Sequence, residues 1–181
     1  GRGVAVALVL AVAGMAVRFQ GRYERASGRL QDYMRSPSEE SLNRVKDCLP
    51  DVIYHPGFMW EYCRHLYLNR RYCDCLGVFP VYHAHVRKTS ETLCDLGNAY
   101  LNVYGFREAE ACFAQARQMI PTRIYPRYCL FRLYRSQGDT LRARQTAKAL
   151  VAFPVRIMNS TSIRIKAEAR NYLKHLRRND W

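Results

Sequence analysis

The segment from Ser90 to Pro121 constrains the fold most, because small residues, aromatic residues and a proline stand in it at fixed distances. Gly97 and Ala109 are spaced as in two helices that cross closely, where a large side chain does not fit. The aromatic residues between them would fill the space toward a neighbouring pair, and Pro121 would end the second helix. The segment predicts two antiparallel helices. Its defining residues are Leu93, Leu96, Gly97, Tyr100, Ala109, Phe113, Ala116 and Pro121.

The same pattern recurs when the frame moves by the length of one tetratricopeptide repeat. In the frame that begins at Ile124, Gly138 would end the first helix and Asp139 would cap the second. Phe131 replaces the small residue Gly97 of the first frame, so we expect this second pair to splay apart. The matching positions hold Leu130, Tyr134, Ala143, Ala147 and Leu150.

A weaker copy of the pattern begins at Pro56, with Cys63 and Cys75 at the two small positions. We therefore expect an all-α fold, a right-handed α-solenoid of about three and a half tetratricopeptide helix pairs with an N-terminal apolar helix and a C-terminal capping helix. The expected divisions are 18–55 for a degenerate first pair, 56–89 for a degenerate repeat, 90–123 and 124–157 for two repeats, and 158–181 for the capping helix.

Residues 1–17 precede this array and contain an uninterrupted apolar run from Val4 to Val17. Every face of a helix formed by this run is apolar, whereas a surface helix has a polar stripe. The run is shorter than the roughly 20 residues that cross a bilayer, and the helical pattern continues past it. We therefore expect residues 1–17 to be the C-terminal part of a truncated transmembrane helix. The apolar core of a signal peptide is the alternative.

The chain carries a formal net charge of +14, and arginine supplies most of the positive charge. Arginine favours phosphate and carboxylate partners, which suggests an acidic glycan or an anionic lipid. Nucleic acid is disfavoured, because the arginines lie on several faces and form no single stripe. Contact with the membrane surface is expected at Arg18, Arg22, Arg25 and Arg29, which follow the apolar run at helical spacing. The alternative interpretation is that these arginines form a solvated face and are partly paired with Glu24 and Asp32. These basic residues favour the cytoplasmic side.

A concave groove, lined by the first helices of successive repeats, is the expected binding site. Aromatic side chains beside arginines suit an extended peptide, a terminal carboxylate or a sugar phosphate. Asn98 matches an asparagine that clamps peptide backbone or carboxylate in peptide-binding arrays, and Cys94 stands where those arrays have a lysine. The alternative is a solvated groove, or one filled by the tail of the chain. The expected groove residues are Trp60, Arg64, Tyr67, Asn98, Tyr125, Tyr128, Arg132 and Arg135.

Neither a catalytic site nor a metal site is expected. The seven cysteines are odd in number and have no regular framework, which argues against a disulfide scaffold. Two pairs of possible metal ligands stand two residues apart, Cys73 with Cys75 and His83 with His85. Residues two apart on a helix point about 200° from each other, so the members of a pair cannot converge on one metal ion. The sequence offers no combination of acid, base and nucleophile that would form the catalytic site of an enzyme. We also expect no cofactor.

The segment 115–169 resembles the C-terminal tetratricopeptide tail of O-antigen ligase/polymerase-like membrane proteins of Bacteroidetes-type bacteria. The resemblance rests on Pro121, Arg123, Tyr125, Pro126, Gly138, Asp139, Thr140, Pro154, Val155 and Arg156. It implies a non-catalytic interaction or scaffold module at the end of a multi-pass glycan protein of the bacterial inner membrane. A protein or peptide partner would bind in the groove. The alternative is an independent membrane-anchored adaptor that binds peptide tails.

Overall fold

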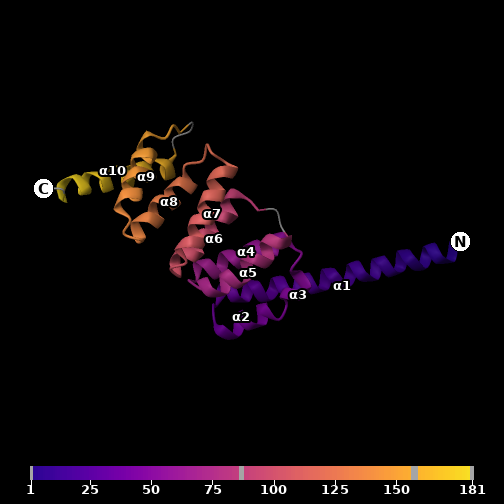
Figure 1. The fold of residues 1–181 in the computed structure, drawn as a ribbon. Helices are drawn as coiled ribbons and strands as arrows, with labels where there is room; N and C mark the ends of the chain where they lie inside the picture. Colours follow the sequence, from indigo (N-terminus) through magenta and orange to yellow (C-terminus); the bar gives the residue numbers. More distant parts are fainter. Residues whose placement is uncertain (1, 86–87, 156–158, 180–181) are drawn as a thin grey trace. The chain divides into compact units, whose positions relative to one another are not determined.

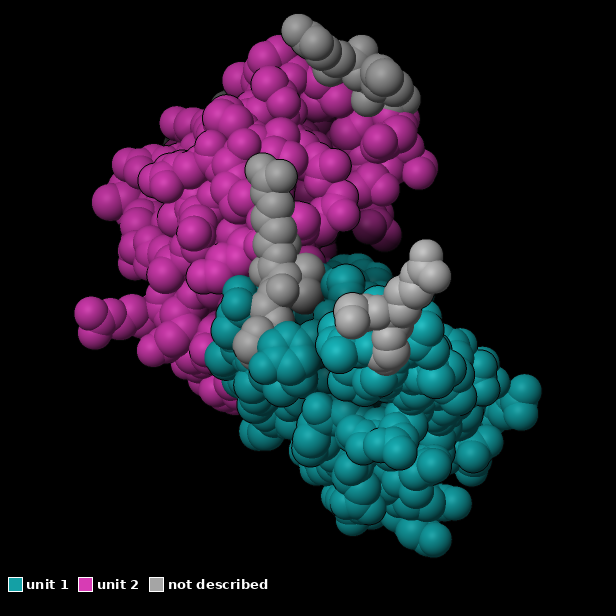
Figure 2. Space-filling view, turned by 90° about the vertical axis from the view of Figure 1, so that its right-hand side faces the viewer, with its two compact units in different colours: residues 1–87 teal, residues 88–181 magenta. Residues whose placement is uncertain are grey.

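The computed structural model describes residues 2–85, 88–155 and 159–179. Over these residues the chain forms ten helices and no strand, which confirms the all-α class (Figure 1). The chain divides into two compact units, which are residues 1–87 and residues 88–181 (Figure 2). Helices α1 to α5 belong to unit 1, and helices α6 to α10 belong to unit 2.

Two helices of unit 1 begin with a local capping interaction. Ser38 accepts a hydrogen bond from the backbone N–H of Ser41, and the imidazole of His55 accepts one from Phe58. Pro56 follows His55 at the first position of its helix, where the fixed φ of proline is suitable. The helices of unit 1 are α1 (Arg2–Arg35), α2 (Glu39–Lys46), α3 (Leu49–Val52), α4 (Pro56–Leu68) and α5 (Tyr72–His85).

Helix α1 has two halves with opposite surroundings. All residues from Val4 to Arg22 are exposed, and the N-terminal end of α1 stands clear of the rest of unit 1 (Figure 1). The other half packs on α2, α3 and α4 and buries Ala26, Leu30 and Tyr33, which repeat at helical spacing. Among the described residues, α1 is the one helix that is long and apolar enough to cross a membrane, a test of length and composition that signal sequences also pass.

Unit 2 is a succession of helices in which each packs on the next, and α8 also contacts α6 and α10. Local caps are present at the starts of two of these helices. Thr89 accepts a hydrogen bond from the backbone of Thr92, and Asp139 accepts one from the backbone of Arg142. The helices of unit 2 are α6 (Ser90–Asn102), α7 (Phe106–Met119), α8 (Tyr125–Ser136), α9 (Thr140–Ala152) and α10 (Ser160–Asn179).

Helices α6 and α7 meet where Gly97 faces the ring of Phe113. A Cβ atom added to Gly97 would lie 2.5 Å from Cε1 of Phe113, which is closer than any real contact of that kind. Leu93, Ala109 and Phe113 are buried in one hydrophobic cluster around this point. The glycine therefore allows the two helices to approach each other closely.

In helices α8 and α9 the large side chain stands on the first helix and the small one on the second, the reverse of α6 and α7. Phe131 stands one repeat length after Gly97 and is fully buried, in one cluster with Ala147, Leu150 and Ile165. Ala147 in turn stands one repeat length after Phe113. Phe131 and the small Ala147 belong to the same buried cluster, and α8 packs on α9 over fewer residues than α6 packs on α7. This smaller contact agrees with the splaying that we expected from the sequence.

The turn inside a helix pair has the same backbone form in three places, each one repeat length from the next. Its central residue has a positive φ, which is 58° at Arg70, 60° at Tyr104 and 72° at Gly138. The N–H of the following residue donates to the carbonyl oxygen five residues before it, as in a Schellman motif. These bonds join Arg71 to Leu66 at 2.9 Å, Gly105 to Tyr100 at 2.9 Å and Asp139 to Tyr134 at 3.0 Å.

Candidate functional site: a groove on helices α6, α8 and α10

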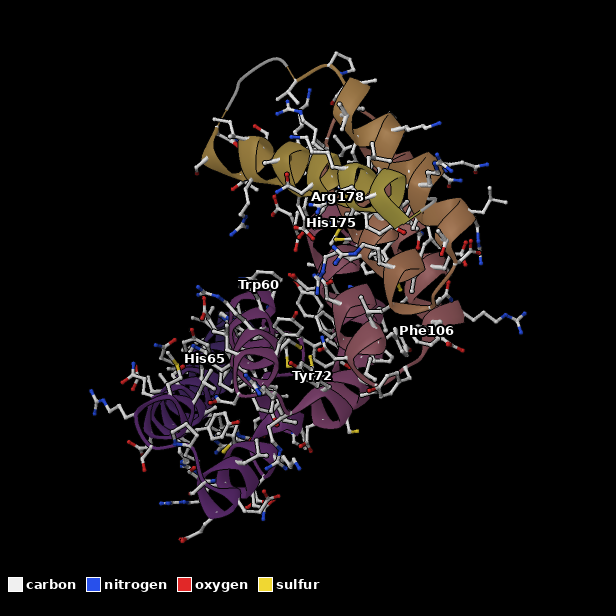
Figure 3. The ribbon with its side chains drawn as sticks, turned by 90° about the vertical axis from the view of Figure 1, so that its left-hand side faces the viewer. Trp60, His65, Tyr72, Phe106, His175 and Arg178 are labelled. Carbon is white, nitrogen blue, oxygen red and sulfur yellow. The ribbon has the colours of Figure 1, made fainter. Side chains whose placement is uncertain are left out.

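The expected groove residues fall into two sets, one in each unit. Trp60, Arg64 and Tyr67 lie on α4 of unit 1, where Trp60 is labelled in Figure 3. Arg64 lies 3.7 Å from the carboxylate of Glu61, and Tyr67 packs edge-on against Tyr72 with ring centroids 5.6 Å apart. The other five expected residues lie on α6 and α8 of unit 2. The structure brings these five residues close to one another.

Asn98 is the centre of the set in unit 2. It is 3% exposed, and its amide Nδ2 donates a hydrogen bond of 3.4 Å to the hydroxyl of Tyr125. Its Oδ1 accepts a hydrogen bond of 3.4 Å from Nη1 of Arg132. Because α6 packs on α8, residues from consecutive helix pairs meet at Asn98.

Arg132 is half-buried and has no acidic partner within the described part of the chain. Its guanidinium contacts the amide of Asn98 and lies 6.0 Å from the centroid of the Tyr128 ring. Neither group carries a full negative charge. A half-buried cation without a carboxylate is only partly compensated, so this guanidinium is available to an anion that enters from outside.

Glu168 of the last helix takes up the neighbouring cation. Its carboxylate accepts one hydrogen bond of 2.6 Å from the hydroxyl of Tyr128 and another of 2.6 Å from Nη1 of Arg135. Sequence reasoning missed this residue, although it is the single carboxylate in the otherwise basic segment Ser160–Asn179. The tail of the chain thus fills part of the groove, at Arg135 and Tyr128, and leaves Arg132 without a carboxylate.

The two tyrosine hydroxyls of the groove keep their protons at neutral pH. Burial raises the pKa of Tyr128 to about 12, and its hydrogen bond to the Glu168 carboxylate acts in the same direction. Burial also raises the pKa of Tyr125. The hydroxyl of Tyr125 accepts from Asn98, and the part of the chain that the structure describes offers no acceptor for its proton. This hydroxyl can therefore donate to a ligand.

Two cavities flank this polar cluster along α8. One, of about 470 Å³, lies between α6, α8 and α10 and is lined by Phe106, Arg132 and Glu168 among others. Figure 3 labels Phe106 at the start of α7 and His175 and Arg178 near the end of α10. The other, of about 730 Å³, lies at the start of α8 and is lined mainly by apolar atoms, including the side chains of Tyr125 and Phe153.

The arginines expected at a membrane surface are divided by the structure. Arg22 forms an ion pair of 3.0 Å with Asp51, and Nη1 of Arg29 donates to the carbonyl oxygen of Arg44 and to Sγ of Cys48. Both are thus used inside unit 1. Arg18 and Arg25 are exposed on α1. Glu24, one of the two acidic residues that the alternative pairs with these arginines, accepts a hydrogen bond from Gln20.

The described residues hold no group of three histidine, cysteine or acidic side chains that could bind a metal. Arg156 and the side chain of His85 lie outside the described residues. No family model matches this chain, and no curated protein matches it in sequence.

Proposed function

We propose that this chain is a non-catalytic interaction module of tetratricopeptide repeats, held at a membrane by α1, which binds a carboxylate-bearing protein segment along α8. The observation that carries the binding proposal is Arg132, a half-buried guanidinium with no acidic partner among the described residues. Asn98 and the hydroxyl of Tyr125 are next to it and add uncharged hydrogen-bonding groups. A carboxylate of the ligand would pair with Arg132 and accept from Tyr125.

The flanking cavities suggest an extended ligand. At 1.5 Å per helical residue, the stretch of α8 between Ile124 and Ser136, which line the two cavities, is about 18 Å long. An extended peptide of about five residues has this length. The apolar cavity beside Tyr125 is suited to a hydrophobic side chain. The acidic group would lie at Arg132, because Arg135 in the other cavity is already paired with Glu168.

The recurrent turn supports the repeat. The left-handed residues Arg70, Tyr104 and Gly138 recur with the period of a tetratricopeptide array. The first of them lies in the segment 56–89, where the sequence pattern is weakest. In such an array each pair packs on the next, and the groove is lined by the first helix of each pair.

The exposed apolar half of α1 supports the membrane anchor, because a surface exposed to water rarely keeps a run of this kind. Together with the resemblance of 115–169, it leads us to propose that the chain is the tail of an O-antigen ligase/polymerase-like protein of a bacterial inner membrane. An independent membrane-anchored adaptor is the second candidate. The gene sequence upstream of Gly1 distinguishes them, since several further apolar segments are expected only in the first case.

The binding proposal is tested by offering the immobilised chain a pool of random pentapeptides with either a free C-terminal carboxylate or a C-terminal amide. We expect the free acids to be retained about tenfold more than the amides, because a hydrogen-bonded charge pair contributes more than a neutral contact. The preference should be lost in Arg132→Gln and kept in Arg107→Gln, which changes an exposed arginine of α7. Equal retention of acids and amides, or an unchanged preference in Arg132→Gln, would rule out this site. Retention of an acidic oligosaccharide by the parent but not by Arg132→Gln would assign the same site to a glycan carboxylate.

A further inference from the structure

The loop between α3 and α4 lies against α1 immediately after its apolar half. The carboxylate of Asp51, in α3, forms the 3.0 Å ion pair with Arg22. The imidazole of His55, which precedes α4, stacks on the ring of Tyr23 with centroids 4.2 Å apart. Helix α3 and the loop after it therefore lie against α1 at the level of Arg22 and Tyr23. Figure 1 shows α3 beside α1. These two contacts fix residues 53–55 to one level of α1.

That level corresponds to the head-group layer if the apolar half of α1 spans the hydrocarbon core. The last residue of the apolar run is Val17, and Arg22 is about 7.5 Å farther along the helix axis at 1.5 Å per residue. The polar layer on one side of a bilayer is about 5–7 Å thick, which is half the difference between the total and the hydrocarbon thickness. Residues 53–55 are thus expected at the outer edge of the head groups.

The side chains at this level suit the interface. Tyr54, at the tip of the loop, is 73% exposed, although it is a large aromatic residue. Phe19 is 49% exposed and stands one helical turn before Tyr23, so it lies on the same face of α1 and nearer to the apolar half. Arg18 stands one turn before Arg22 in the same way and is exposed. Tyrosine is enriched where membrane meets water, and arginine there attracts anionic head groups.

We propose that Tyr54, together with Phe19 and Arg18, forms a contact between unit 1 and the lipid head groups. This inference rests on the proposed anchoring of the chain by α1. Helix α1 is continuous from Arg2 to Arg35, and its second half is part of the core of unit 1. Unit 1 is therefore joined to the membrane by a stiff helix, and the α3–α4 loop gives it a second point of support on the bilayer surface.

The opposite end of unit 1 provides a matched control position. Helix α4 starts at the loop and ends near Asn69, which lines a cavity with Tyr33 and Ser38 at the far end of α1. Tyr33 is about 24 Å beyond Val17 along the axis. Leu68, the last residue of α4, is 60% exposed. A probe at Leu68 is therefore exposed in unit 1 but remote from the proposed membrane contact.

The experiment places single tryptophans in the full chain, in a background with Trp60→Phe and Trp181→Phe. The variants Tyr54→Trp, Leu68→Trp and Val12→Trp are reconstituted in vesicles of phosphatidylglycerol and phosphatidylethanolamine. Some of these vesicles carry lipids brominated near the glycerol end of the acyl chains, others carry lipids brominated near the methyl end. We expect the fluorescence of Tyr54→Trp to be quenched by the shallow bromines. Its emission should also lie at shorter wavelength than the emission of the same variant without lipid. Leu68→Trp should be unaffected, and Val12→Trp should be quenched by the deep bromines.

The three positions separate the failure of this inference from the failure of the anchor. Quenching at Val12→Trp without any quenching at Tyr54→Trp overturns the contact and leaves the anchor in place. Equal quenching of Tyr54→Trp and Leu68→Trp also overturns it, because unit 1 would then not be oriented by the loop. An unquenched Val12→Trp overturns both the anchor and the contact. Circular dichroism of each variant checks that the helices are intact.

Discussion

The helix pairs α6–α7 and α8–α9 hold corresponding places in unit 2, but the large and the small side chain stand on opposite helices in the two pairs. In the first pair, Gly97 on α6 makes room for the ring of Phe113 on α7. In the second pair the large residue is Phe131 on α8, and the small residue is Ala147 on α9. We infer that a helix pair tolerates the exchange of its large and its small side chain, with a smaller contact between α8 and α9 as the result.

The largest effect is expected from Gly97→Phe, which gives the first pair two large residues. The Cβ atom alone would meet Phe113 at 2.5 Å, so the variant should lose the cooperative unfolding of unit 2, as followed by circular dichroism on heating. The double variant Gly97→Phe/Phe113→Ala has the arrangement of the second pair and should recover most of the lost stability.

The single variant Phe113→Ala completes this double-mutant cycle. It should be destabilised by about 3–5 kcal/mol through the cavity that it leaves. If the exchange is compensating, the double variant is more stable than the sum of the two single effects predicts. A double variant as unstable as that sum would show that the two helix pairs are not interchangeable in this way.

The second effect concerns the other pair. Phe131→Ala should reduce the free energy of unfolding by about 3–5 kcal/mol, because Phe131 is fully buried beside an alanine that cannot fill the space. Chemical denaturation measures the loss. The control is Leu141→Ala on the exposed surface of α9, which should change stability by less than about 0.5 kcal/mol. A loss for Phe131→Ala as small as that of the control would mean that Phe131 does not hold α9 and α10 against α8.

A smaller effect is expected in the turn of the second pair. Gly138 has a φ of 72°, and a Cβ atom added to it meets no atom within 4 Å. Gly138→Ala should therefore cost about 1 kcal/mol, entirely through the left-handed backbone. Thermal unfolding of the variant measures this cost. An alanine variant as stable as the parent would indicate that the turn can relax to another conformation.

Local signals in the sequence were sufficient for some features. The cap Asp139 and the turn residue Gly138 are recognisable because each acts on its own neighbours in the chain. The contact of Glu168 with Tyr128 was not recognisable, because it depends on how α10 packs on α8. The role of Ala147 was missed for a similar reason, since its size has meaning only beside Phe131.

Two of the three left-handed turn residues also escaped the sequence analysis, because neither Arg70 nor Tyr104 is a glycine. Their side chains give no sign of a positive φ, and it is the hydrogen bond from the following residue that holds the backbone in this form. The same turn therefore exists in three copies, and the positive φ is strained at Arg70 and Tyr104 but not at Gly138.

The smallest effect is a gain in stability at Arg70. Arg70→Gly should stabilise unit 1 by about 0.5–1 kcal/mol, because the penalty of a left-handed arginine exceeds the entropy that glycine loses on folding. Tyr104→Gly should gain less, since the ring of Tyr104 packs edge-on against Phe106 with centroids 6.0 Å apart and this contact is lost. Thermal unfolding of both variants tests the order. A destabilised Arg70→Gly would contradict the shared turn, because its left-handed backbone would then carry no strain for glycine to relieve.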